Sequence, residues 1–310
     1  MFEFPDRCLW PLKRCAERIL PAGIYLGAQR WYWKLKGEYY EPETFARRLL
    51  RGKKRPTEGD IRVSILCNVW NTPPDFLSQT VESVLNQNYR NWEFLVNNCS
   101  DADDFRVNEC LKHCGDDPRV RMFRTENRGI ANNSNYLISQ ATGEFVLLLD
   151  HDDVLLPDAL AVMMEAQKKE NSDFVYADEI VLFMSVRHLL RTHKKPFSMS
   201  ALEKENFINH PALIRKTLLE KVDGFREGFE GSQDHDLYLR LCEKTDKIAY
   251  VPRPLYVWRL SGGNFSANNL EKCIDSGRRA VQEHLDRMNI RGKVIADQKL
   301  AVFTISRDPE

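Results

Sequence analysis

Three features of the sequence predict an α/β fold in which helices flank a mostly parallel sheet. Short apolar runs alternate with amphipathic helical patterns between residues 61 and 180, as in doubly wound sheets. The runs lack polar alternation, so we expect parallel strands that are buried on both faces. The run at residues 145–149 ends abruptly in carboxylates, at the edge where such sheets bind ligands. With 310 residues, 43% of them hydrophobic, the chain can form one large or two modest domains.

The elements of the first half follow from apolar runs and from helix start signals. The first helix is expected to be capped by Thr72, with Pro73 in its first turn. Two further helices are predicted at residues 130–140 and 157–167, where apolar side chains recur at helical spacing. Each strand is a β-rich apolar run, and the strands are predicted at residues 61–67, 92–96, 119–124, 145–149 and 174–176.

After about residue 180 the pattern loosens. A long amphipathic helix is expected at residues 267–289, and a strand at 300–305 that begins a further element. Shorter elements are expected at residues 212–214, 216–222, 234–243 and 247–251.

Residues 1–60 are predicted to be a basic, aromatic helical extension. They contain 13 Lys or Arg and 8 Asp or Glu, a net charge of +5, with helical patterns at residues 8–20 and aromatic side chains among basic ones at 24–36. Such a segment suits a membrane surface. The alternative is a helical extension that packs on its own domain or on a partner protein.

Composition excludes several classes of protein. The formal net charge is zero, so the chain lacks a global basic field for nucleic acid. No apolar run approaches the ~20 residues that span a bilayer, and no signal peptide is visible. The eight cysteines form no disulfide-scaffold pattern, which favours the reducing cytoplasm. Cys110 and Cys114 are interpreted as helix residues rather than as a metal clip.

The carboxylates of Asp150, Asp152 and Asp153 lie within four positions. They repel one another unless a positive group joins them, and a hard divalent cation takes oxygen ligands of this kind. The alternative for an isolated D-x-D is a solvated acidic turn.

Several short motifs occur in a fixed order between roughly residues 60 and 285. In this order they resemble the motifs of family 2 glycosyltransferases with the GT-A fold, especially bacterial enzymes of O-antigen and capsule assembly. The motifs are Val63-Ser64-Ile65, Trp70-Asn71-Thr72-Pro73, Ser83-Val84-Leu85 with Gln87 and Tyr89, Trp92-Glu93, Asn127-Arg128-Gly129-Ile130, Ala141-Thr142-Gly143-Glu144, Leu149-Asp150-His151-Asp152-Asp153, Tyr176-Ala177-Asp178-Glu179, Lys195-Pro196, Gly224-Phe225-Arg226, Gly231-Ser232-Gln233-Asp234-His235-Asp236-Leu237, and Tyr256 with Trp258-Arg259.

The resemblance implies an inverting, single-displacement hexosyl- or deoxyhexosyltransferase with Mn or Mg as cofactor. It implies a nucleotide-sugar donor, UDP- or dTDP-linked, and a lipid-linked or oligosaccharide acceptor in surface polysaccharide synthesis. Residues 61–180 would form the nucleotide-binding half and 181–265 the acceptor half of one catalytic domain, with a C-terminal helix and strand at 266–310. The basic extension would place the protein in the cytoplasm, on the inner face of the membrane or beside partner glycosyltransferases. The chain also resembles one module of larger members.

The resemblance implies roles for four acidic residues. Asp152 is the first choice as metal ligand, and Asp150 would contact the ribose or the metal. Asp153 is either a third member of this group or the cap of the helix near Pro157. Asp234 occupies the position of the catalytic base; the alternative is a helix N-cap, where the helix field would favour its ionised form.

The nucleotide site departs from the family pattern, because Asn97-Asn98-Cys99-Ser100 stands where most relatives have Asp-Asp-x-Ser. An amide still accepts from a pyrimidine N3–H and also donates to a carbonyl. Trp70 would stack on the base, with core packing as the alternative. The full nucleotide set is Asn68, Trp70, Asn98, Asp150 and Arg128.

Two further groups complete the expected site. Arg259 and Lys195 are candidates for diphosphate contact, with surface salt bridges as the alternative for Lys195. A flexible loop is expected at Gly262-Gly263. The candidates for acceptor contact are His210, Gln233 and Asp178, and for His210 a core role is the competing interpretation.

Two other functions are compatible with parts of the sequence. A non-catalytic module that binds glycans or partner enzymes would explain Asn97-Asn98, but it needs neither the D-x-D carboxylates nor Asp234. A nucleotidylyltransferase needs a Gly-rich nucleotide loop that residues 61–75 lack.

Overall fold

The computed structural model describes residues 56–101, 105–112, 117–183, 188–260, 269–297 and 301–306. The predicted N-terminal helices, the membrane or partner contacts of residues 1–55, Cys114 and the Gly262-Gly263 loop lie outside the described residues. Cys110 lies in a helix, as predicted, and its thiol donates to the Pro74 carbonyl.

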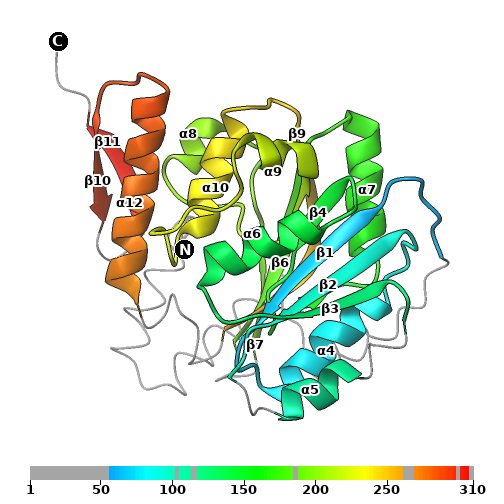
Figure 1. Ribbon diagram of the computed structural model, residues 1–310. Helices are drawn as coiled ribbons and strands as arrows, with labels where there is room; N and C mark the ends of the chain where they lie inside the picture. Colours follow the sequence, from blue (N-terminus) through cyan, green and yellow to red (C-terminus); the bar gives the residue numbers. More distant parts are fainter. Residues whose placement is uncertain are drawn as a thin grey trace.

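The α/β class is confirmed: helices flank a nine-stranded mixed sheet with the order β3-β2-β1-β4-β8-β6-β9-β5, and β7 pairs with β6 (Figure 1). The first four strands pair in parallel, as predicted. They are β1 (Val63–Val69), β2 (Trp92–Asn98), β3 (Val120–Arg124) and β4 (Phe145–Leu148). Because β1 and β2 run in register, with Asn68 opposite Asn97, their carboxyl ends meet at one edge.

The second half adds antiparallel pairs to the sheet. Its strands are β5 (Val154–Leu155), β6 (Phe174–Phe183), β7 (His188–Thr192), β8 (Ala212–Arg215) and β9 (Ile248–Leu260). Both β6 and β9 are much longer than the sequence indicated. Pro252 and Pro254 interrupt the strand pattern of β9, and the structure accommodates them at the register shift around Asp178 in its partner β6.

Helices cover both faces of the sheet. One face packs on α4 (Pro74–Leu85), α5 (Phe105–Lys112) and α7 (Ala159–Glu170). The other face packs on α6 (Ile130–Gln140), α9 (Lys216–Lys221) and α10 (Gln233–Cys242), with the short α8 (Met199–Leu202) beside them. Successive side chains of a strand point to opposite faces of the sheet. The neighbours Ile65 and Leu66 in β1 accordingly belong to the two different cores.

The prediction that Thr72 caps α4 is wrong. Pro73 occupies the N-cap and Pro74 begins the helix, so the rigid φ of proline starts it without a side-chain cap. The Thr72 hydroxyl lies 2.9 Å from Nδ1 of His151 in the acidic turn.

The C-terminal unit consists of α12 (Leu270–Arg287), β10 (Lys293–Asp297) and β11 (Val302–Ser306). The strand expected at 300–305 is present as β11, and it pairs antiparallel with β10 as a hairpin. Val294 and Phe303 turn inward from this hairpin and share a core with α10 and α12. The unit therefore packs directly on the helix that carries Asp234 (Figure 1).

Candidate functional site

The acidic turn follows β4 at the carboxyl edge of the parallel strands. β4 pairs with β1, and the turn at residues 150–153 comes directly after it. The three carboxylates differ in exposure: the side chain of Asp150 is 50% exposed, that of Asp152 is 20% exposed, and Asp153 is buried. Burial, with the charge of Asp150 contributing, raises the pKa of Asp152. Asp150 is thus the carboxylate that is most open to a ligand.

Asp153 does not cap a helix, so this prediction is corrected. Its Oδ2 accepts from the Tyr256 hydroxyl at 2.8 Å, and its Oδ1 accepts from the Arg259 backbone N–H at 2.8 Å. The Tyr256 oxygen also accepts from the Asp150 backbone N–H at 3.2 Å. Burial, together with the charges of Asp150 and Asp152, raises the pKa of Asp153 well above its ordinary value. Asp153 therefore supports the turn from a buried position. The residue at the start of α7 is Asp158, not Asp153.

Arg259 lies beneath the same turn. The side chain is buried; it donates to the Asp152 carbonyl and, at 2.5 Å, to Gln79 Oε1. Its guanidinium carbon lies 5.0 Å from the Phe76 ring centroid. The structure thus gives Arg259 a role in holding the turn, and the contact with diphosphate that the sequence suggested stays a prediction.

His210 brings the second half of the chain to the acidic turn. Its Nε2 lies 3.4 Å from Asp150 Oδ2, and its ring stacks on Tyr256 at 5.0 Å between centroids. The side chain is 14% exposed, and its Nδ1 is a buried atom without a hydrogen-bond partner, 3.8 Å from Glu179 Oε2. His210 therefore faces the site, whereas the competing interpretation was a satisfied core histidine.

One group among the described residues has the spacing to hold a metal ion: oxygens of Asp150 and Asp153 and a nitrogen of His210 lie within 4.8 Å of one another. Asp152, the first choice from sequence, is not in this group. Both oxygens of Asp153 already accept hydrogen bonds, whereas Asp150 is exposed and faces Nε2 of His210 at 3.4 Å. A carboxylate with an imidazole suits a divalent cation, so the residues present fit one.

Asp234 lies in the first turn of α10, after Ser232 at the N-cap. Burial raises its pKa to about 6; the charge of His210 lowers the pKa and that of Asp150 raises it. The sequence argument that the helix field would favour the ionised form is therefore outweighed by desolvation. A carboxylate with a pKa near 6 is suited to accept a proton at neutral pH.

The polar residues at the ends of β1 and β2 form a connected edge. Asn68 donates to Ser134 at 3.1 Å, and Asn97 donates to Thr125 at 2.9 Å. Asn98 donates to Asn108 at 3.0 Å, and its Oδ1 accepts from the Ser100 N–H at 3.0 Å.

The remaining nucleotide candidates lie on the surface. The side chain of Trp70 is 52% exposed, which excludes the core-packing alternative and leaves its ring open to stacking. Arg128 is exposed just before α6.

Two predicted residues lie apart from this arrangement. Lys195 is exposed and pairs with Glu205 at 3.4 Å, which is the surface salt bridge that the sequence left open. Asp178 is fully buried and accepts from Arg191 at 3.0 Å, the Lys194 N–H at 2.9 Å and the Tyr250 hydroxyl at 2.7 Å. We therefore do not keep Asp178 among the acceptor candidates. The side chain of Gln233 accepts from the Gly231 N–H at 2.7 Å. Because of its position next to Asp234, Gln233 stays a candidate for contact with the acceptor.

Sequence reasoning missed Lys194, which is buried under His210. Its ammonium donates to the carbonyls of Ile208 and His210 and lies 3.6 Å from Glu179 Oε2. Glu179 in turn accepts from the His210 backbone N–H at 3.3 Å. Burial lowers the pKa of Lys194, while Glu179 and Asp178 raise it. Two adjacent lysines in a sequence ordinarily indicate exposed positions. Nothing in the sequence therefore predicts that Lys194 is buried beside Glu179.

Lys194→Met is expected to destabilise the protein by about 3–5 kcal/mol, because it leaves Glu179 buried without its cation. The matched control is the neighbouring substitution Lys195→Met, which removes only an exposed pair that contributes about 0–1 kcal/mol. Urea unfolding of both variants measures the difference. Equal losses from the two would contradict the buried role of Lys194.

An acidic turn lies at the edge of the parallel half of the sheet, and the second half of the chain places the carboxylate of Asp234 near this turn. This fold and site define a glycosyltransferase of the GT-A fold. The chain belongs to the family described as Glycosyl transferase family 2, which matches residues 64–226, more than half of the chain.

Three curated relatives are bacterial proteins much longer than this chain. It is 34% identical to the uncharacterized protein y4gI of Sinorhizobium fredii, over 82% of this chain and 28% of that protein. It is 31% identical to the O-antigen biosynthesis protein RfbC of Myxococcus xanthus, over 75% of this chain and 18% of that protein. It is 29% identical to the chondroitin synthase of Pasteurella multocida, over 74% of this chain and 24% of that protein. The chain thus spans less than a third of the length of these relatives.

Solved structures show the same fold at low identity. S. aureus TarS 1-349 in complex with UDP-GlcNAc aligns with a TM-score of 0.58 at 16% identity, over 73% of this chain and 67% of that chain. The mannosyltransferase PcManGT from Pyrobaculum calidifontis, in complex with GDP-Man and Mn2+, aligns with a TM-score of 0.54 at 17% identity, over 82% and 73%. Within the part of the chain that the structure describes, no helix has the length and apolar character to cross a membrane.

Proposed function

We propose that the protein is a metal-dependent, inverting glycosyltransferase that transfers one sugar from a UDP- or dTDP-sugar to a lipid-linked or oligosaccharide acceptor. The observation that carries this proposal is the convergence of Asp150, His210 and Asp234, which come from three segments far apart in the sequence. A binding module has no need for a carboxylate with a raised pKa beside a candidate cation site.

The residues divide the work as follows. Asp234 takes the proton of the acceptor hydroxyl as that oxygen attacks the anomeric carbon. Asp150, Asp152 and His210 would hold Mn or Mg, which when bound offsets the charge of the leaving diphosphate. Trp70 offers a stacking surface for the base, and Asn68, Asn98 and Arg128 bind the rest of the nucleotide.

The proposed biological setting is supported by the relatives and by the composition of residues 1–60. Similarity to RfbC supports a role in O-antigen or capsule synthesis. The basic aromatic residues of 1–60 support a location on the cytoplasmic face of the membrane or beside partner glycosyltransferases. Hexosyl or deoxyhexosyl transfer fits this setting.

A thermal-shift panel of UDP, dTDP, GDP and CMP, each with Mn or with EDTA, tests the proposal. A ligand that binds only the folded state raises its stability by mass action. We expect a shift for UDP or dTDP that depends on the metal. A shift for another nucleotide would reassign the donor, and no shift with any of the four would refute the proposed donor site.

One observation favours the alternative, a non-catalytic module that binds glycan or a partner enzyme. The Asn98 amide stands where relatives have a carboxylate, and it is already bonded to Asn108 and Ser100. Glycan binding without any nucleotide-dependent shift would establish this alternative.

A further inference from the structure

The serine at the start of α10 does not serve as a helix cap. An N-cap serine ordinarily accepts from the backbone N–H groups of the first turn. The Ser232 side chain makes no such bond and instead donates to the carbonyl of Cys273 on α12, at 2.7 Å. Its hydroxyl therefore ties the first turn of α10 to the C-terminal helix.

A close approach at Gly277 supports this tie. A Cβ at this position would lie 3.2 Å from Ser232 Oγ and 2.6 Å from Cζ of Phe303 on β11. The absence of a side chain on Gly277 thus lets α12, the hairpin and the start of α10 meet at one point.

The residues that follow Asp234 are held by the same C-terminal unit. The His235 ring stacks on Phe303 at 5.8 Å between centroids. Burial lowers the pKa of His235 to about 4, so its ring is neutral, and Nε2–H donates to the Leu202 carbonyl at 2.6 Å.

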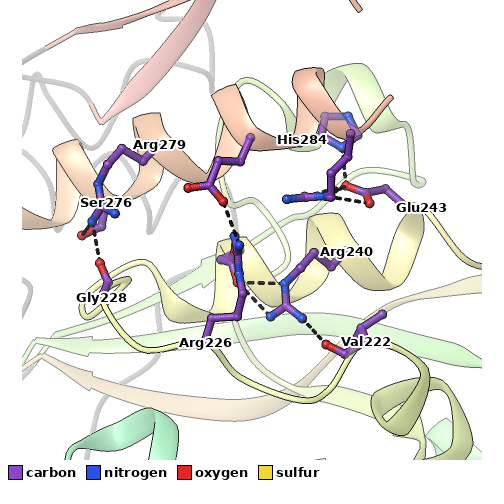
Figure 2. Close-up of polar contacts among 11 residues, drawn as sticks. Val222, Arg226, Gly228, Arg240, Glu243, Ser276, Arg279 and His284 are labelled. Atoms are coloured by element: carbon purple, nitrogen blue, oxygen red, sulfur yellow. Dashed lines mark hydrogen bonds and ion pairs between the residues drawn. The ribbon is translucent and has the colours of Figure 1, made fainter. Parts of the chain in front are cut away.

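Asp236 forms ion pairs with Arg226 and Arg240. Figure 2 shows Arg226 next to Arg240, and the bond from Arg240 to the Val222 carbonyl. Arg226 also pairs with Glu283 of α12 at 2.7 Å. Asp236 is therefore a structural residue, as the sequence indicated.

The carboxylate of Asp234 differs from its neighbours, because no hydrogen bond to it is found among the described residues. Its position is set by the backbone of residues 232–236, and three of these residues are fixed by contacts of their own. An error of about 1 Å in the position of a catalytic group can cost about a hundredfold in rate.

We propose that Ser232 is a positioning residue for Asp234, and that the C-terminal unit of α12, β10 and β11 holds the catalytic base in place through it. This inference rests on the proposed function, since it presumes that Asp234 accepts the acceptor proton. It adds a residue and a structural unit that act through the backbone rather than by touching the substrate.

Ser232→Ala tests the inference in the full chain. We expect kcat to fall at least about tenfold, while KM for the nucleotide-sugar and its thermal shift stay within about twofold, since the acidic turn is untouched. Gly277→Ala should act in the same direction by separating α12 from Ser232.

The control loosens the opposite end of the same helix pair. Arg287 of α12 pairs with Glu243, just past the end of α10, at 2.7 Å. Arg287→Gln should lower the Tm at least as much as Ser232→Ala and leave kcat unchanged. Wild-type kcat in Ser232→Ala, or an equal loss of kcat in Arg287→Gln, would overturn the positioning role.

Asp234→Asn, assayed in parallel, separates the two hypotheses. If this variant still transfers sugar at a rate near that of the wild type, the proposed base is wrong. If it is inactive while Ser232→Ala is fully active, the base stands and only the positioning role fails.

Discussion

Asp234→Asn is expected to lower sugar transfer by about 10²–10⁴-fold and to leave nucleotide binding intact. The amide has nearly the same shape but cannot take the proton of the acceptor hydroxyl. The acidic turn that would bind the cation and the nucleotide is unchanged, so the metal-dependent thermal shift should persist.

The control for this substitution is Glu230→Gln. Glu230 lies in the turn just before α10, but its carboxylate accepts from the Gly228 N–H at 2.9 Å and pairs with Lys272 at 3.3 Å. Its loss should leave transfer near the wild-type rate. Substantial transfer by Asp234→Asn would remove Asp234 from the base role.

The raised pKa of Asp234 gives the same substitution a signature in stability. The carboxyl has an ordinary pKa of 3.8 and a folded pKa of about 6, so its favourable contribution is present below pH 3.8 and is lost as the pH rises through 6. At pH 8 Asp234→Asn should therefore have a higher Tm than the wild type, and at pH 3.5 the difference should vanish. For the same reason, transfer by the wild type should decline below about pH 6.

Asp150→Asn is expected to abolish the metal-dependent part of nucleotide binding. Asp150 is the most exposed carboxylate of the turn and faces His210 Nε2 at 3.4 Å, so its loss removes the oxygen best placed for a cation. In titrations with Mn, the thermal shift given by a nucleotide should fall to its value in EDTA.

Asp152→Asn tests the ligand that the sequence favoured, and Asp246→Asn, at an exposed position far along the chain, is the control. An unchanged Mn titration in Asp152→Asn would reject Asp152 as a ligand. The same result in Asp150→Asn would reject the candidate cation site itself.

Much of the fold could be predicted because strands and helices of the first half carry strong local patterns. The apolar run before Asp150 was predicted to be a buried parallel strand, and it pairs in parallel with β1. The lengths of β6 and β9 could not be predicted, because Pro252 and Pro254 are tolerated only through a bulge that tertiary pairing creates. The strand β11 was expected, but its partner β10 was not, because the stability of this hairpin comes from packing on α10 and α12.

Site residues could be predicted where polar side chains directly follow a strand in the sequence. They could not be predicted where their role depends on contacts between residues far apart in the chain. Asp150 and Asp234 were named as candidates from the motifs and from the resemblance, and their roles stay predictions. The support of Asp153 by Tyr256, and the buried Lys194 under His210, join residues that are distant in the chain. Asp178 was misjudged because its sequence position says nothing of the three donors that surround it.

The most direct test of the central claim is the anomeric configuration of a transferred sugar, followed by NMR together with nucleoside diphosphate release. The protein would be given the nucleotide-sugar selected by the thermal-shift panel, Mn, and a set of lipid-linked and oligosaccharide acceptors. We predict one diphosphate released for each glycosidic bond, with inverted configuration, and product formation about 10²–10⁴-fold slower in Asp234→Asn. A product with retained configuration would contradict the single displacement with Asp234 as base.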